Sequence, residues 1–130
     1  DLLREFGSSK GLWVRKEDPI TIETSEPEPD VSVVVGKRSE FRHQKPRTAQ
    51  FVIEVAVSTL TRDQAKAGIY AAAEIPEYWI IRPEDGCVEV YRDPVGGDYH
   101  EKTKIESGAT IESTALPGFS FCLQDALKEE

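Results

Sequence analysis

Two acidic residues and a lysine are spaced so that they could share one catalytic site. Asp30 opens the β-branched run 31–35, Glu54 is the one carboxylate within the apolar run 49–57, and Lys66 follows in an alanine-rich segment. If the two runs pair as neighbouring strands, both carboxylates lie at one end of a sheet. There they would repel each other unless a cation neutralised them.

Such oxygen ligands suit a hard cation, Mg²⁺ or, in its place, Mn²⁺. Mg²⁺ accepts one or two carboxylates and keeps several waters, and the backbone carbonyl of Val55 offers a further oxygen. A metal held in this way activates water to attack a phosphodiester. The residues alone also allow a structural arrangement, in which Asp30 caps backbone N–H groups and Glu54 forms a buried ion pair with Lys66.

The elements that must position these residues follow from hydrophobic patterns and turn residues. Residues 63–74 form a predicted helix that Pro76 ends, with its apolar face at positions 65, 69, 72 and 73 and with Lys66 and Tyr70 on an adjacent face. The turn at 83–86 joins two strands into a hairpin, and 94–98 is expected to be a loop. The predicted strands are 12–15, 20–22, 30–35, 49–57, 77–81, 87–91, 99–105 and 120–123, and a short helix is expected at 123–127.

The bulk composition bounds the class of protein. With 130 residues, 38% hydrophobic and 31% charged, the chain is expected to form one domain over residues 1–130 of the α/β or α+β class. No apolar run approaches the roughly 20 residues of a membrane span, so no membrane partner is expected. Cys87 and Cys122 lack paired spacing, which favours small buried side chains and a cytoplasmic location. The first residues include neither Met nor a signal peptide, so we expect the natural N-terminus to be missing.

The net charge of −8 disfavours a broad basic surface for nucleic acid. A local basic patch is nevertheless present and could supply DNA contacts. It consists of Lys37, Arg38, Arg42, His43, Lys45 and Arg47.

Several sequence runs, in order, resemble the Uma-two family of putative restriction endonucleases. They are Pro29-Asp30, the run 51–55 that contains Glu54, the segment 63–70, the run 75–81 with Glu-Tyr-Trp, and 88–92. The resemblance covers roughly residues 12 to 123.

The resemblance implies a PD-(D/E)XK nuclease-like fold, a restriction-endonuclease-like mixed β-sheet flanked by helices. Asp30 matches the first acid of the motif and Glu54 the second. Ala56 stands where the standard motif has lysine, and in this family the lysine is thought to come from the following helix, where Lys66 lies. The Lys66 ammonium would then stabilise charge on the attacked phosphate.

Other polar residues are weaker candidates. Tyr70 is expected to pack as an aromatic, Gln64 stays outside the proposed site, and Glu5 is the only nearby match for a helical acid that the family often has before the first strand. His43 and His100 have no Ser or Cys partner that would indicate a hydrolase triad.

Two function hypotheses follow. The first is a Mg²⁺-dependent endonuclease acting on DNA, with Asp30, Glu54 and Val55 as metal ligands and Lys66 beside them. The second is a non-catalytic dimer or interaction module that keeps the fold. A homodimer is expected in either case, because nucleases of this superfamily commonly pair.

Overall fold

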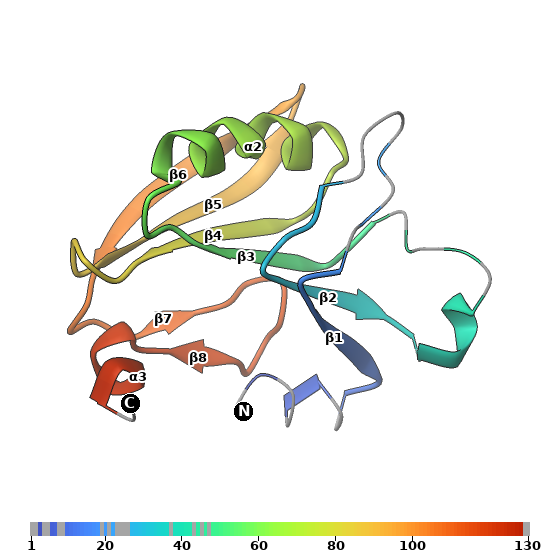
Figure 1. The fold of residues 1–130 in the computed structure, drawn as a ribbon, viewed down its shortest axis with the longest axis horizontal. Helices are drawn as coiled ribbons and strands as arrows, with labels where there is room; N and C mark the ends of the chain where they lie inside the picture. Colours follow the sequence, from blue (N-terminus) through green and yellow to red (C-terminus); the bar gives the residue numbers. More distant parts are fainter. Residues whose placement is uncertain are drawn as a thin grey trace.

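Six strands form one mixed sheet in the order β1-β2-β3-β4-β5-β6 (Figure 1). The structure, a computed structural model, describes Leu3, Phe6, Gly7, Ile20, Ile22, Gln44, Pro46 and residues 10–18, 27–36, 38–42 and 48–128. All neighbours in the sheet are antiparallel except β3 and β4, which run parallel. The strands are β1 Leu12–Lys16, β2 Val31–Val35, β3 Phe51–Val55, β4 Glu77–Arg82, β5 Cys87–Val95 and β6 Asp98–Glu106.

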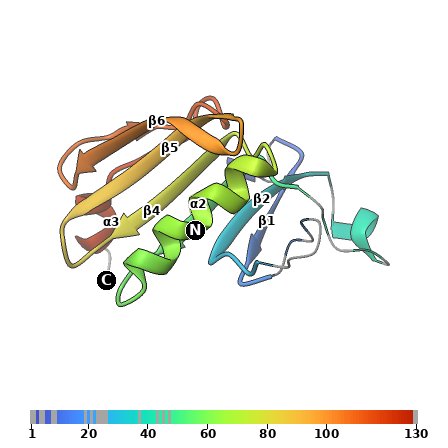
Figure 2. The same cartoon turned by 90° about the horizontal axis from the view of Figure 1, so that it is seen from above.

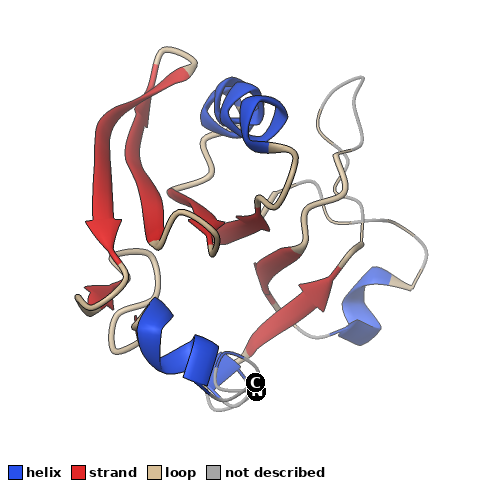
Figure 3. Cartoon of the chain, turned by 60° about the vertical axis from the view of Figure 1, so that its left-hand side comes forward, coloured by secondary structure: helices blue, strands red, loops and turns tan. Residues whose placement is uncertain are grey.

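Helix α2 (Leu60–Ala72) connects the two parallel strands, because a parallel pair needs a crossover connection. It lies over β4, β5 and β6 on one face of the sheet (Figure 2). The other face carries the two-stranded sheet of β7 (Ile111–Glu112) and β8 (Ser120–Phe121), followed by α3 (Leu123–Lys128) (Figure 3). A short 3₁₀ helix, η1 (Arg38–Phe41), follows β2. This architecture confirms the predicted mixed sheet with flanking helices.

Side-chain alternation divides the apolar residues into two clusters, one on each face of the sheet. In β3, Val52 faces α2, whereas Phe51 and Ile53 face the layer of β7, β8 and α3. Trp79 of β4 packs edge-on against Phe51 at 4.8 Å. By the same alternation Glu54 points to the α2 face, so the acid enters the layer that contains the helix.

The buried face of α2 differs from the predicted one. Asp63, Ala67, Tyr70 and Ala71 are buried, whereas Ile69 is 39% exposed and Ala65 and Ala72 are also exposed. The predicted apolar face was therefore wrong at 65, 69 and 72, whereas Ala73 is partly buried and packs against the cluster on the α2 side. Tyr70 supplies the large apolar surface, because its ring packs in the core while its hydroxyl finds a polar partner.

Of the predicted strand 20–22 the structure describes only Ile20 and Ile22, which are both buried in the cluster on the α2 side. The predicted loop at 94–98 was wrong in its bounds. β5 continues through the expected loop to Val95, and Pro94 pairs with Tyr99. The pairing of β4 with β5 ends at Arg92. Pro94 lies beyond that point, so its missing N–H does not cost a hydrogen bond to β4.

Candidate active site

Asp30 lies immediately before β2 and opposite Glu54. The extended segment Pro27–Pro29 leads the chain into the strand, and β2 pairs antiparallel with β3 so that Val31 faces Ile53. The backbone N–H of Asp30 donates a hydrogen bond to Glu54 Oε1 at 2.8 Å, and Asp30 Oδ2 accepts one from the Val55 N–H at 2.7 Å. The predicted pairing of the two acids at one end of the sheet is therefore present.

Glu54 is 2% exposed and holds the centre of the site. Its Oε2 accepts hydrogen bonds from Lys66 Nζ at 2.9 Å and from the Tyr70 hydroxyl at 3.3 Å. Burial raises the pKa of Glu54 above its ordinary value, and the hydrogen bonds from Asp30 and Lys66 oppose that rise only in part. The site thus holds a carboxylate whose charged form lacks full compensation by the protein.

Lys66 reaches Glu54 from the second turn of α2. Its side chain is 23% exposed, and its Nζ lies 3.6 Å from Asp63 Oδ1 as well as 2.9 Å from Glu54. Asp63 is oriented by the Thr59 hydroxyl, which donates to Oδ2 at 2.7 Å. The ammonium therefore lies between two carboxylates at the edge of solvent, where a substrate oxygen can approach it.

Two tyrosines fix the floor of the site beneath α2. Tyr70 and Tyr78 are fully buried and pack edge to face at 4.9 Å, and the Tyr78 hydroxyl donates to the Asp63 backbone carbonyl at 2.7 Å. Burial, with a smaller contribution from the nearby Glu54 carboxylate, raises the pKa of each phenol above its ordinary range. Both hydroxyls therefore stay protonated, and Tyr70 remains a donor to Glu54 while packing as predicted.

Val55 follows Glu54 at the open end of β3 and is 40% exposed. Its backbone N–H is bound to Asp30, so main chain and carboxylate are held together at this end of the strand.

The donor set fits a hard divalent cation that keeps most of its water. Two carboxylates and a backbone carbonyl are the kind of ligand set that Mg²⁺ uses beside substrate phosphates. Each carboxylate offers about four acceptor positions, so the contacts described above leave capacity for a metal. Among the described residues, no group of three or more His, Cys, Asp or Glu side chains is arranged to hold an ion. An ion at this site would therefore need water or substrate oxygens to complete its coordination.

The remaining predicted residues lie away from this centre. Gln64 is exposed and donates to both carboxylate oxygens of Glu89 at 3.1 and 3.0 Å, and His100 is exposed on β6. Cys87 is fully buried, as expected, and Cys122 is half-buried, with both thiols free. In the basic patch, Arg38 and Arg42 are exposed. The predictions for Glu5, Lys37, His43, Lys45 and Arg47 lie outside the described residues.

Sequence reasoning missed a second buried carboxylate, Glu77, on the opposite face of the sheet. It is 0% exposed, and its Oε1 accepts from the Ser113 hydroxyl at 2.6 Å and from the Ala115 N–H at 3.1 Å. Its Oε2 accepts from Trp79 Nε1 and Arg92 Nε, each at 2.9 Å. Four donors satisfy this carboxylate, so Glu77 ties β4 to the loop after β7. The sequence signal that could have indicated a buried carboxylate is the position of Glu77 at the start of an apolar strand.

Within the described residues, no helix is both long enough and apolar enough to cross a bilayer. Among solved structures, the fold is similar to that of a putative nuclease belonging to DUF820 from Anabaena variabilis. That likeness has a TM-score of 0.79 at 16% sequence identity, and it covers 98% of this chain and 74% of the other. No curated protein matches the chain.

A family model matches residues 2–126, nearly the whole chain, and its family is described as "Putative restriction endonuclease". The match agrees with the resemblance seen in the ordered motifs. The chain belongs to this family, Uma2.

Proposed function

We propose that this chain is a nuclease that hydrolyses DNA phosphodiester bonds with Mg²⁺ or Mn²⁺, using a site of the PD-(D/E)XK type. The observation that carries the proposal is the meeting of three elements at one point. Asp30 before β2, Glu54 on β3 and Lys66 on α2 are linked by hydrogen bonds of 2.8 and 2.9 Å. Membership of a family described as "Putative restriction endonuclease" supports the same chemistry.

In this proposal Asp30, Glu54 and the Val55 carbonyl hold the ion, which when bound would activate the attacking water and polarise the phosphate. The Lys66 ammonium stabilises the negative charge that develops on the phosphate oxygens. Tyr70 keeps the Glu54 carboxylate oriented through its hydroxyl. Asp63 is a second carboxylate partner for Lys66. The ammonium can therefore move from Glu54 toward a substrate phosphate and still have a carboxylate close to its positive charge.

Cleavage assays on supercoiled plasmid and on single-stranded DNA, with Mg²⁺ or Mn²⁺, test the proposal. We expect cleavage by the wild type, and its loss in Glu54→Gln and Asp30→Asn. Glu89→Gln is a matched control, because Glu89 faces the same side of the sheet but bonds to Arg82 and Gln64. Wild-type protein that cuts neither substrate, or cutting that survives in Glu54→Gln, would refute the proposed site.

A second candidate, a non-catalytic module with the nuclease fold, is favoured by one observation. Both oxygens of Glu54 already accept hydrogen bonds from protein groups, as in a purely structural ion pair. Calorimetric titration distinguishes the two candidates. A nuclease binds Mn²⁺ and loses that binding in Glu54→Gln, whereas the module binds no Mn²⁺ at millimolar concentration and remains folded.

A further inference from the structure

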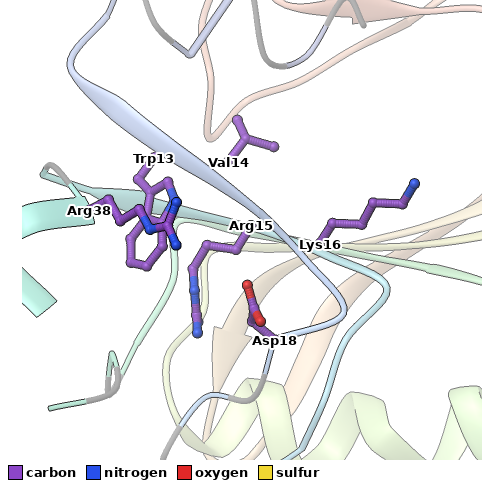
Figure 4. Close-up of a pocket in the computed structure, with 6 residues that line it drawn as sticks. All are labelled: Trp13, Val14, Arg15, Lys16, Asp18 and Arg38. Atoms are coloured by element: carbon purple, nitrogen blue, oxygen red, sulfur yellow. The ribbon is translucent and has the colours of Figure 1, made fainter. Parts of the chain in front are cut away.

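Two hollows adjoin beside β1 and η1, at the end of the sheet away from β6. One, of about 350 Å³, is lined by Trp13, Val14, Arg15, Lys16, Asp18 and Arg38 (Figure 4). The other, of about 600 Å³, is lined by Trp13, Arg38, Ser39, Phe41 and Arg42. Because Trp13 and Arg38 line both, the two hollows are neighbours, and we name the pair the β1 trough.

The β1 trough differs in charge from the rest of the chain. Among its described lining residues Arg15, Lys16, Arg38 and Arg42 are basic and Asp18 alone is acidic, in a chain with a net charge of −8. Lys16, Arg38 and Arg42 are exposed, so their charges are available to a partner. Glu40, in the same 3₁₀ turn, is not among the residues that line either hollow. An acidic protein that concentrates basic side chains in one depression presents a site for a polyanion.

Aromatic rings lie among these basic groups. Trp13 and Phe41 stack with centroids 5.5 Å apart and planes at 26°, and the Arg15 guanidinium lies 4.9 Å from the Trp13 ring. Figure 4 shows the Trp13 ring beside the Arg38 side chain. A basic groove with aromatic side chains is how proteins bind single-stranded nucleic acid, since phosphates meet the cations and bases contact the rings.

The β1 trough begins at the candidate active site. Lys16 pairs with Val31, and the N–H of the next residue, Glu17, donates to the Asp30 carbonyl at 3.0 Å. Arg15 pairs with Ser32, which pairs with Val52, so Arg15 lies on the sheet face to which Glu54 points.

We propose that one strand of DNA lies in the β1 trough, with phosphates on Arg38 and Arg42 and a base against the paired rings of Trp13 and Phe41. The proposal rests on the proposed function, because it places the same substrate beside Asp30. The trough then receives the part of the strand that lies just outside the cleavage point, and it favours single-stranded over duplex DNA.

Binding is measured without cleavage, by fluorescence anisotropy of a labelled single-stranded oligonucleotide in EDTA over a series of salt concentrations. For Arg38→Ala and for Arg42→Ala we expect affinity to fall about five- to tenfold, and the slope of log affinity against log salt to fall by about 0.7 for each lost phosphate contact. Lys104→Ala is the matched control, because Lys104 is an exposed cation of β6, at the far edge of the sheet, and should bind as the wild type does.

Tryptophan emission gives a second measurement. The chain has two tryptophans, and Trp79 is 0% exposed, so a base in the trough should change the emission of Trp13. We expect a change on adding single-stranded DNA to the wild type and none in Trp13→Phe.

Three results would overturn the proposal: no binding by the wild type, unchanged binding by both arginine variants, or duplex DNA bound as tightly as the single strand. The anisotropy measurement in EDTA is independent of catalysis. If the arginine variants lose binding and the wild type does not cleave DNA, the trough is supported and the nuclease proposal is rejected. If the wild type cleaves DNA and the arginine variants bind normally, the nuclease proposal is supported and the trough is rejected.

Discussion

Replacing Glu54 with glutamine should leave the fold as stable as the wild type, or more stable, at neutral pH. Burial raises the pKa of Glu54 even with Lys66 and the Asp30 N–H beside it, so folding disfavours the carboxylate relative to the neutral carboxyl. Glutamine has nearly the same shape and no charge. Its amide oxygen can accept from the Asp30 N–H, while Lys66 moves toward Asp63, which is already 3.6 Å away.

The expected gain is between zero and about 2 kcal/mol in the free energy of unfolding, because the variant removes a buried charge while Lys66 is left with solvent and with Asp63 as partners, so that no buried charge loses all compensation. For a chain of this length about 1 kcal/mol corresponds to roughly 4 °C in Tm, so Glu54→Gln should melt up to about 8 °C above the wild type. Calorimetry at neutral pH, without divalent metal, measures the difference.

The pH dependence has a definite sign. Because the folded pKa of Glu54 is raised, the folded protein binds its proton more tightly than the unfolded chain does. This contribution to stability is fully present below the ordinary glutamate pKa and is lost as pH rises through the raised folded value. Glu54→Gln has no titrating group at this position, so it does not lose this stability as pH rises. The Tm of the variant should therefore exceed that of the wild type above the raised pKa of Glu54, and the difference should disappear below the ordinary glutamate pKa.

Glu77→Gln is the matched control. Glu77 accepts four hydrogen bonds, two on each oxygen, so either orientation of a glutamine amide brings its NH₂ group against N–H donors. We expect this variant to lose about 2 to 4 kcal/mol. A fall in Tm of Glu54→Gln as large as that of Glu77→Gln would refute the reasoning, because Glu54 would then be a structural carboxylate.

The remaining predictions concern the site and the assembly. Tyr70→Phe removes one donor to Glu54, so we expect about 1 kcal/mol lower stability by calorimetry, and weaker Mn²⁺ binding by titration; unchanged binding would contradict an orienting role. Lys66→Met should keep Mn²⁺ binding but lose DNA cleavage, and a variant that cleaves normally would exclude Lys66 from the chemistry. Light scattering should give about twice the 14.5 kDa chain mass, as a homodimer requires, and a monomer at all concentrations would reject that expectation.

The acids could be predicted because each breaks a strong pattern. A lone glutamate within a run of apolar β-formers is conspicuous, and Pro29 before Asp30 marks a strand start. Lys66 needed the family resemblance as well, since a helical lysine is more often solvated.

Other features depended on three-dimensional neighbours. The face of α2 was misassigned because Tyr70 was placed with Lys66 on a face adjacent to the apolar one, whereas its side chain is fully buried. β7 could not be predicted, since two residues have no measurable period and pair with β8 only once the chain has folded back. The four partners of Glu77 come from β4, β5 and the loop after β7, which no local pattern reveals.

The origin of the three site residues along the chain has a consequence for how the site is assembled. Glu54 and Lys66 are 12 residues apart and belong to one strand–helix unit, whereas Asp30 comes from 24 residues before Glu54. Closing the longer loop carries the larger entropic penalty, so docking of β2 onto β3 should follow formation of the unit that contains Glu54 and Lys66. During refolding, the ability to bind a divalent ion would therefore appear late. The rate at which it appears would report the rate at which β2 docks onto β3.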